Sequence, residues 1–357
     1  MKNIVVLATG GTIAGAGEQG KDIGYKSGSI EAQTLVDAVP ELKTVANIRV
    51  EQVCNINSDD VTSEIWIALV HRIEELSKCA DVDGFVIMHG TDTMEETAFF
   101  LSLTLGANVA GENVACATIA KPVVLTGSMR PATATEPDGP ANLLFAVRSA
   151  VEYSVELSSR PQCRDHRLSF ANNVPVFVAF AGKLMDAWTV QKVHANALDS
   201  FAEISNSGVI LSRDEKSGAS QPALSSRTPF RDQFLEPTFD ISSLHSLPKV
   251  SVLYFNADAD AELVRFAAEH SAGLVVAGAG AGEFSQAWAD ALAKVNVPVV
   301  VSTRINRGCI VPEQLLVKGT IAAYDLPPAK AAVLLRLALT VTNDPVAIQK
   351  FYQDCSV

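Results

Sequence analysis

A short apolar run that ends in two glycines and a threonine constrains the fold of this chain more than any other stretch. Residues 4–7 read Ile-Val-Val-Leu, which predicts a buried β-strand almost at the start of the sequence. Gly10 and Gly11 then allow a sharp turn that a ligand can approach closely, and Thr12 adds a hydroxyl. In open α/β sheets, ligands bind at the carboxyl ends of strands, where Thr12 would lie. Taken alone, the stretch is equally typical of a strand that ends in a capped turn.

Apolar runs and helical periodicities alternate along the rest of the 357 residues. The predicted strands after the first are residues 50–56, 84–88, 122–126, 174–180, 250–255, 273–277 and 297–302. The predicted helices are residues 63–78, 259–270, 285–294 and 328–342, with three more that begin near residues 93, 139 and 344. Such alternation predicts an α/β fold with two domains of mainly parallel sheet flanked by helices.

The two predicted domains differ in size. Residues 1–212 predict a larger, flavodoxin- or Rossmann-like N-terminal domain that carries most of the candidate site residues. Residues 248–357 repeat the strand–helix alternation on a smaller scale and predict a C-terminal α/β domain. Residues 213–247 between them are rich in serine, proline and charge, which is typical of a linker.

Composition excludes several classes of function. The formal net charge of −12 opposes binding to nucleic acid phosphates and to anionic lipid, so we expect neither partner. No apolar run reaches the ~18–20 residues that span a bilayer. No secretion signal precedes the first strand, which predicts a cytoplasmic protein, or a periplasmic one if a leader has been removed. The six cysteines and six histidines show no metal-ligand spacing, so we expect no metal.

A second polar turn follows the predicted third strand. It reads His-Gly-Thr-Asp-Thr-Met-Glu-Glu, starting at His89, and Thr93 and Glu96 have the spacing of a capping box for the next helix. Thr91 and Asp92 would then lie at the carboxyl end of a strand, beside a helix N-terminus that favours negative charge. Two such turns in one sheet suggest a shared pocket. His89 itself is more typical of a structural core histidine.

Two other stretches allow both a structural and a functional interpretation. Residues 14–30 are dense in glycine and carry one aromatic residue, Tyr25. This segment is either a simple connector or a lid that closes over the turn at Thr12. Ser58 and Asp59 follow the second strand, where capping of the next helix is the plainer interpretation.

Taken together, these stretches show that the sequence resembles the bacterial-type L-asparaginase family of asparaginase/glutaminase amidohydrolases. The amino-acid sequence of the motifs is most similar to that of the type II members. Residues 9–14 (TGGTIA) resemble the family's first signature, and residues 89–98 (HGTDTMEETA) resemble its second. Residues 127–131 (GSMRP) and 138–140 (DGP) form a third block in the same order. The resemblance covers nearly the whole chain.

The resemblance implies an L-asparagine amidohydrolase with weaker L-glutaminase activity. It would work through a threonine nucleophile and an acyl-enzyme, without a metal or another cofactor. Thr12 would attack the side-chain amide carbon, and Tyr25 would assist its proton transfer. Thr91, Asp92 and Lys192 would form a second polar triad that orients a water molecule or relays a proton. Which threonine attacks first is left open.

The resemblance also implies where the substrate binds and how the chain assembles. Ser58 and Asp59 would hold the α-carboxylate and α-amino groups, with Asp92 near the amino group. In this family, the C-terminal domain of a neighbouring subunit adds an acidic or amide residue to the site. Glu283 is the first candidate for that residue, and Glu313 is the second. The implied assembly is a homotetramer built as a dimer of intimate dimers.

The sequence departs from the family pattern at several points, and two other functions remain open. Trp188 stands where the family usually has arginine, Asp59 stands where relatives often carry Gln or Glu, and residues 106–121 and 153–172 are longer than usual. An amidotransferase-related subunit that supplies ammonia to a charged transfer RNA shares these motifs. The acidic charge and the position of Thr12 near the start disfavour that function. A non-catalytic α/β protein that binds a small amino acid would need the substrate-binding residues but not the catalytic set.

Overall fold

The computed structural model describes residues 1–21, 24–105, 121–159, 174–204 and 239–355. The described residues fall into two compact units, the first within Met1–Glu203 and the second comprising Ile204 and residues within Phe239–Val357. The predicted linker, residues 213–247, lies outside the described residues up to residue 238, so its limits stay a prediction. None of the helices in the described part of the chain has both the length and the apolar character that a bilayer crossing needs.

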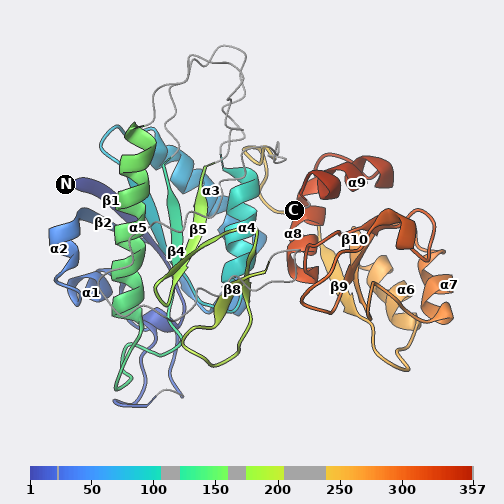
Figure 1. Cartoon of the computed structure of the whole chain (residues 1–357), viewed down its shortest axis with the longest axis horizontal. Coiled ribbons are helices and arrows are strands. Elements are labelled where there is room, and N and C mark those ends of the chain that lie inside the picture. Colours follow the sequence, from blue (N-terminus) through green and yellow to red (C-terminus); the bar gives the residue numbers. More distant parts are fainter. Residues whose placement is uncertain (22–23, 106–120, 160–173, 205–238, 356–357) are drawn as a thin grey trace, which may run out of the picture. The chain divides into compact units, whose positions relative to one another are not determined.

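The first unit is built on a six-stranded sheet (Figure 1). Its strands are β1 (Lys2–Gly10), β2 (Ala46–Ile56), β3 (Gly84–Met88), β4 (Val123–Thr126), β5 (Val176–Phe180) and β6 (Lys183–Asp186). Their order is β2-β1-β3-β4-β5-β6; the first five run parallel, and β6 runs antiparallel to β5. The order 2-1-3-4-5 is that of the flavodoxin-like fold. The predicted α/β class is therefore confirmed.

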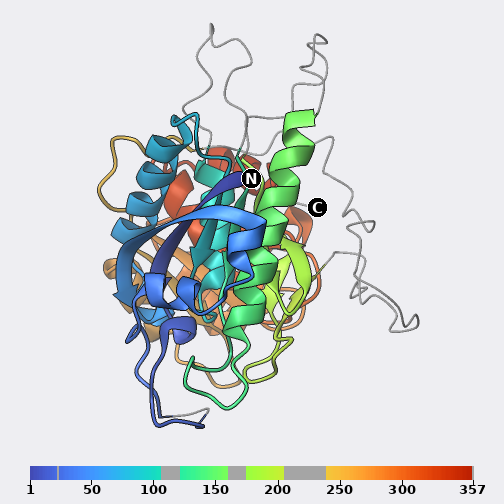
Figure 2. The same cartoon turned by 90° about the vertical axis from the view of Figure 1, so that its left-hand side faces the viewer.

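Helices cover both faces of this sheet (Figures 1 and 2). One face carries α1 (Ala32–Asp37), α2 (Leu42–Val45) and α5 (Gly139–Ser159), and the other carries α3 (Ser63–Ser77) and α4 (Met94–Thr104). Alternate residues of a strand point to opposite faces. Ile4 and Val6 of β1 accordingly pack in one cluster with Val147 of α5, while Val5 and Leu7 are buried toward the other face. Because both faces are covered, β1 is apolar without interruption over these residues.

A small two-stranded sheet follows β6. Its strands are β7 (Val190–Lys192) and β8 (Phe201–Glu203), which pair antiparallel. Trp188 lies just before β7 and is buried; its ring meets that of Phe99 on α4 edge-on, with the centroids 5.0 Å apart. The tryptophan thus packs the start of β7 against α4.

The second unit is a smaller four-stranded parallel sheet with helices on both faces (Figure 1). The strands are β9 (Val250–Tyr254), β10 (Gly273–Gly278), β11 (Val299–Thr303) and β12 (Ile321–Ala322), in the order β12-β11-β10-β9. The helices are α6 (Glu262–Glu269), α7 (Gln286–Leu292), α8 (Pro328–Ala338) and α9 (Pro345–Asp354). Trp288 of α7 is fully buried against this sheet.

Several local predictions are wrong or incomplete. The capping box is wrong, because Thr93 makes no side-chain cap and its hydroxyl instead donates to the carbonyl of Ser58. Of the two stretches that are longer than usual, the second begins inside α5, which extends to Ser159; residues 106–120 and 160–173 lie outside the described residues. The short elements α1, α2, β6, β7, β8 and β12 were not predicted.

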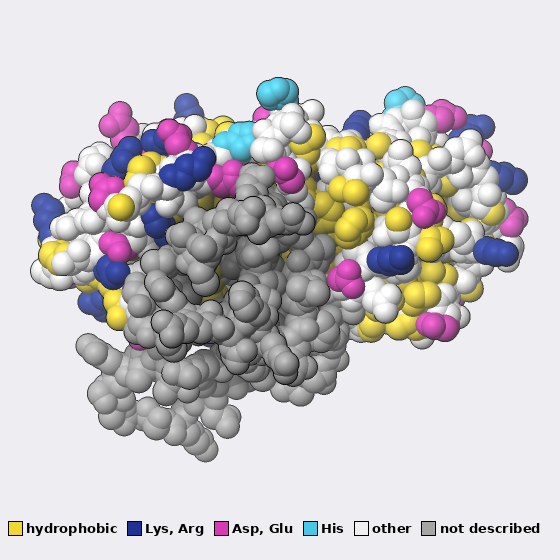
Figure 3. Space-filling model, turned by 90° about the horizontal axis from the view of Figure 1, so that it is seen from above, with side chains coloured by type: hydrophobic (Ala, Val, Ile, Leu, Met, Phe, Trp, Pro, Cys, Tyr) yellow, Lys and Arg dark blue, Asp and Glu magenta, His cyan; other side chains and the backbone are white. Residues whose placement is uncertain are grey.

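Charges of both signs are interspersed on the surface. On the face shown in Figure 3, described Lys and Arg side chains alternate with Asp and Glu side chains. Two arginines are paired in this way on the first unit: Arg49 and Arg72 both contact the carboxylate of Glu51.

Candidate active site

The candidate site lies where the order of the main sheet reverses. In a flavodoxin-like sheet, ligands bind outside the carboxyl ends of the strands, at the switch point between β1 and β3. Thr12 follows β1, Ser58 follows β2 and Thr91 follows β3. Since these three strands are neighbours and run parallel, the three turns meet at one edge of the sheet.

Two glycines let the turns come into contact. Gly10 and Gly11 both have positive φ angles, of 108° and 81°, which side chains other than glycine rarely adopt. A Cβ atom on Gly11 would lie 2.5 Å from the backbone of Gly90, so the turns after β1 and β3 pack backbone against backbone. A Cβ atom on Gly10 would lie 2.5 Å from the carbonyl of Ile56 at the end of β2, so close backbone contacts explain both glycines before Thr12.

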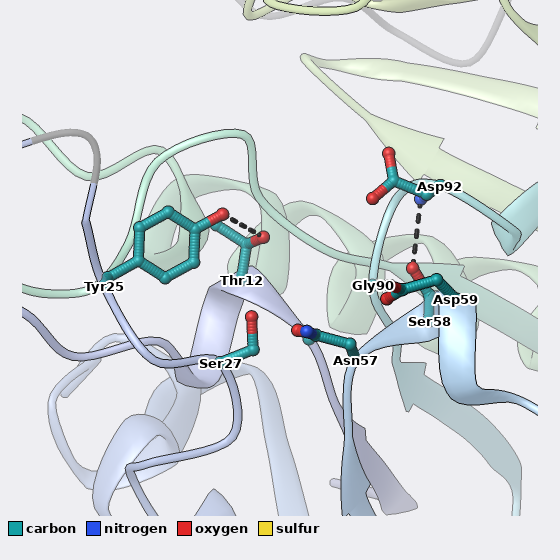
Figure 4. A pocket seen from close by; sticks show the side chains of 9 residues that line it. Thr12, Tyr25, Ser27, Asn57, Ser58, Asp59, Gly90 and Asp92 are labelled. Carbon is teal, nitrogen blue, oxygen red and sulfur yellow. Dashed lines mark hydrogen bonds between the residues drawn. The ribbon is translucent and has the colours of Figure 1, made fainter.

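A polar cavity of about 240 Å³ opens between these turns (Figure 4). Every residue around it is either a glycine or carries a polar side chain. The lining consists of Gly11, Thr12, Tyr25, Ser27, Asn57, Ser58, Asp59, Gly90 and Asp92. The cavity is smaller than the roughly 300–1,000 Å³ typical of pockets for drug-sized ligands, which favours a small polar ligand.

Thr12 and Tyr25 face each other at one side of the cavity (Figure 4). Thr12 starts a turn of 3₁₀-helix, and its Oγ1 lies 2.9 Å from the hydroxyl of Tyr25. Backbone hydrogen bonds hold the glycine-rich loop that carries Tyr25 in place. Ala16 and Lys26 exchange backbone hydrogen bonds, and Gly20 N–H donates to the carbonyl of Thr133 at 2.8 Å. In this structure the loop therefore presents Tyr25 to Thr12, as a closed lid would.

Lys192 joins Thr91 and Asp92 in a second hydrogen-bonded group. Its Nζ donates to Thr91 Oγ1 at 2.8 Å and to Asp92 Oδ1 at 2.6 Å. Thr91 is buried and the lysine side chain is 15% exposed, whereas the Asp92 side chain is 69% exposed. The ion pair is thus open to solvent on one side, which limits its contribution to stability. Its clearer consequence is geometric, because it directs the ammonium group at the hydroxyl of Thr91.

Ser58 links the turn after β2 to the turn after β3. Its buried hydroxyl accepts a hydrogen bond from Asp92 N–H at 3.2 Å, and its carbonyl accepts one from Thr93 Oγ1 at 2.8 Å. Ser58 and Asp59 belong to a short 3₁₀-helix, and both border the cavity. The simple capping interpretation of these two residues is therefore wrong, and α3 begins after Thr62.

His89 is buried and holds the turn after β3 in place. Its Nδ1 contacts the carbonyl of Gly90 at 2.7 Å, and its Nε2 lies 3.0 Å from Thr97 Oγ1, which in turn accepts from the indole N–H of Trp66. Complete burial lowers the pKa of His89 to about 4, from an ordinary value of 6.5. A neutral ring with its proton on Nδ1 satisfies all of these contacts. His89 is thus a structural residue, as predicted.

Two lining residues were missed from the sequence. Asn57 directly precedes Ser58 at the end of β2, and Ser27 lies two residues after Tyr25 on the same loop. Position at a strand end was the available signal for Asn57. Ser27 carried no signal of its own, because only the folded loop brings it to the cavity.

The remaining candidates lie in the second unit. Glu283 is exposed at the end of a tight loop after β10, in which Ala279 and Glu283 form an isolated bridge. Glu313 is also exposed and lies in a 3₁₀-helix, Pro312–Gln314. The structure brings Thr12, Tyr25, Ser58, Asp59, Thr91, Asp92 and Lys192 together in the first unit. Within the described residues, no group of three or more His, Cys, Asp and Glu side chains is arranged to hold a metal ion.

The fold and the site define a two-unit α/β protein with a hydroxyl-lined cavity at its switch point, and comparison with known proteins specifies the family. Residues 3–221 match the model of the asparaginase N-terminal domain, and residues 249–352 match that of the glutaminase/asparaginase C-terminal domain. The chain is 37% identical to a probable periplasmic L-asparaginase of Haemophilus influenzae, over 99% of this chain and 93% of that protein. It is 35% identical to L-asparaginase 2 of Escherichia coli, with the same coverage.

A solved structure is also similar over its whole length. The crystal structure of a probable cytoplasmic L-asparaginase from Campylobacter jejuni superimposes with a TM-score of 0.77 and 35% sequence identity, covering 99% of this chain and 100% of that one. The chain belongs to the asparaginase family.

Proposed function

We propose that this chain hydrolyses the side-chain amide of L-asparagine to L-aspartate and ammonia, and acts more weakly on L-glutamine. One observation carries the proposal: two threonine hydroxyls at one site each have a partner suited to proton transfer. Thr12 lies 2.9 Å from the hydroxyl of Tyr25, and Thr91 lies 2.8 Å from the ammonium of Lys192. Membership of the asparaginase family supports the choice of an amide as substrate.

The first step forms an ester on Thr12. Its Oγ1 attacks the amide carbon, and the hydroxyl proton passes through Tyr25 to the amide nitrogen. The carbon–nitrogen bond then breaks and ammonia leaves. A threonine hydroxyl is a weak nucleophile near neutral pH, so the contact with Tyr25 supplies the activation that the attack requires.

The second step consumes one water molecule. The Lys192 ammonium holds the Thr91 hydroxyl, which orients the water; the water oxygen bonds to the acyl carbon while its proton passes through the Thr91 hydroxyl. The bond to Thr12 breaks, and a proton returns to its oxygen. One amide and one water thus yield one acid and one ammonia, with no further reactant, metal or cofactor.

The polar residues across the cavity would hold the amino-acid end of the substrate. The Ser58 hydroxyl accepts a hydrogen bond from Asp92 N–H, so its own proton can be donated to the α-carboxylate of the substrate. Asp59 and Asp92 supply negative charge for the α-ammonium group. Asp59 has a short side chain, and the cavity is small, which together support a preference for asparagine over the longer glutamine.

The direct test is ammonia release from L-asparagine and L-glutamine by the wild-type chain and by Thr12→Ala. We expect turnover of asparagine, slower turnover of glutamine, and loss of both in the variant, which should keep the thermal unfolding curve and oligomeric mass of the wild type. A wild-type protein that binds L-asparagine but releases no ammonia would instead support the non-catalytic binding function.

We also propose that the chain assembles as a homotetramer in which Glu283 completes the site of a neighbouring subunit. The support is the family resemblance and the exposure of Glu283 on the loop after β10. Light scattering measures the mass of the assembly. Mixing unfolded Thr12→Ala and Glu283→Ala chains and refolding them together tests the sharing of residues: each variant alone would be nearly inactive, and hybrids would recover activity. No recovery in correctly assembled hybrids contradicts the shared site.

The proposed compartment is the cytoplasm. The names of similar proteins include a periplasmic and a cytoplasmic L-asparaginase, so the family occurs in both. Fractionation of the source cells, followed by detection of this chain, distinguishes the two.

A further inference from the structure

The first turn of α4 and the residues just before it anchor Lys192 at both ends of the residue. The Nζ donates to Thr91 and Asp92, which directly precede this helix. The main-chain N–H of Lys192 donates to Glu95 Oε2, in the first turn of the same helix. We propose that Glu95 is a positioning residue for the amide hydrolysis: through its contact with the backbone of Lys192, it holds the ammonium group at the distance from Thr91 that proton transfer requires. This role rests on the proposed function.

The strand that carries Lys192 turns the edge that is not paired with β8 toward this contact. β7 has three residues and pairs with β8 on one side, with Lys192 opposite Phe201. The next residue, Val193, donates its N–H to Ser200 at 2.8 Å, toward β8. Successive N–H groups of a strand point to opposite sides. The N–H of Lys192 therefore points away from β8, and the Glu95 carboxylate is the acceptor that meets it.

The helix side of this contact is rigid. Residues 97–104 of α4 are all buried, and Thr93 and Asp92 are each hydrogen-bonded to Ser58. Thr91 and Asp92 are thus fixed against the main sheet, whereas Lys192 belongs to a separate two-stranded sheet. The relative position of these two parts decides whether Nζ reaches Thr91. Glu95 joins them by a hydrogen bond to a charged acceptor, which is stronger than one between neutral groups.

A purely structural role for Glu95 predicts a different result. A carboxylate in the first turn of a helix also stabilises the helix through its dipole. Glu64 provides a matched control, because it is the second residue of α3, as Glu95 is of α4, and both helices begin after a threonine N-cap. Glu64 is exposed. Loss of either carboxylate removes a similar dipole contribution, and only loss of Glu95 releases the backbone of Lys192.

The kinetic test compares Glu95→Ala, Glu95→Gln and Glu64→Ala in the ammonia assay. We expect Glu95→Ala to lower kcat by roughly 10- to 100-fold while KM changes by less than about threefold. The reason is that loss of the Glu95 carboxylate lets the ammonium group of Lys192 move away from Thr91. Glu95→Gln keeps an acceptor oxygen and should recover most of kcat, and Glu64→Ala should match the wild type. In a Lys192→Ala background, Glu95→Ala should cause no further loss. Full activity of Glu95→Ala, or an additive loss in the double variant, overturns the proposal.

A second measurement does not depend on activity. Hydrogen–deuterium exchange of the peptide that contains Lys192 should show one faster amide in Glu95→Ala, and unchanged exchange in Glu95→Gln and Glu64→Ala. Unchanged exchange in Glu95→Ala refutes the backbone contact, whatever the activity. A wild-type protein that hydrolyses neither amide contradicts the proposed function instead, and the exchange result then stands as the test of the contact alone.

Discussion

The buried ring of His89 should make the stability of this protein fall as the pH drops below neutral. Burial holds the pKa of His89 at about 4 in the folded chain, against an ordinary value of 6.5. Between these values the unfolded chain binds a proton on this residue and the folded chain does not. The unfolding free energy is therefore fully present above pH 6.5 and falls as the pH decreases toward 4.

The size of this effect follows from the two pKa values. Their difference corresponds to a loss on the order of 3 kcal/mol once the pH reaches 4. Between pH 7.5 and 5.0, the expected loss is about 2 kcal/mol. The pKa values of Glu51, Asp83 and Asp240 are also altered, but all three are lowered from ordinary values of 4.5 or 3.8. Their contributions are lost mainly below pH 5, and comparison with a variant of His89 separates its effect from those of other titrating groups.

The perturbation is His89→Gln, which removes the titrating ring and keeps a side chain able to donate and accept hydrogen bonds. Urea unfolding, followed by tryptophan fluorescence, gives the free energy of unfolding of both proteins at pH 7.5 and 5.0. Both proteins must be measured at one protein concentration, because subunit association adds to apparent stability. The wild type should lose about 2 kcal/mol more than the variant over this window. Equal losses, to within roughly 0.5 kcal/mol, would refute the buried neutral ring.

Three further substitutions test individual contacts. Tyr25→Phe removes the hydroxyl beside Thr12 and should lower kcat for asparagine by about 100-fold or more, with little effect on folding; wild-type kcat would exclude tyrosine from proton transfer. Gly11→Ala places a methyl group 2.5 Å from the backbone of Gly90 at a positive φ, and should cost about 1–3 kcal/mol in urea unfolding as well as most of the activity; a stable, active variant would contradict the contact between the two turns. Thr97→Val removes the hydroxyl that both the indole nitrogen of Trp66 and Nε2 of His89 contact. It should lower the free energy of unfolding by about 1–3 kcal/mol in urea unfolding, whereas an unchanged unfolding curve would show that another group replaces the hydroxyl.

The strand-end turns could be located from the sequence because short-range patterns determine them. β1 and β3 are buried and apolar without interruption, so their ends were visible as the points where polar residues begin. β2 lies at the edge of the sheet and carries polar residues throughout, so its end was marked only by the polar run after Ile56. Thr12, Ser58 and Thr91 follow these ends, and the parallel sheet brings them together. The alternation of strands and helices predicted a doubly wound sheet but did not distinguish the flavodoxin-like from the Rossmann strand order, which tertiary pairing decides.

Long-range contacts could not be predicted in this way. Lys192 lies about one hundred residues from Thr91, and only the family resemblance indicated its role. The capping box at Thr93 failed because the carbonyl of Ser58, which is distant in sequence, competes for the hydroxyl. Strands such as β7, with three residues, are too short to show a periodicity, and tertiary pairing alone creates them. Ser27 reaches the cavity only through the fold of its loop.

The central claim is that Thr12 forms the acyl-enzyme, and the most direct measurement is the site of that ester. The wild type and Thr91→Val, in which activation of water is impaired, are mixed with L-asparagine, quenched in acid within milliseconds and digested for mass spectrometry. We predict an aspartyl group on the peptide that carries Thr12, at higher occupancy in Thr91→Val than in the wild type. An aspartyl group found instead on the wild-type peptide that carries Thr91, or rapid turnover with no ester on either threonine, would contradict the account.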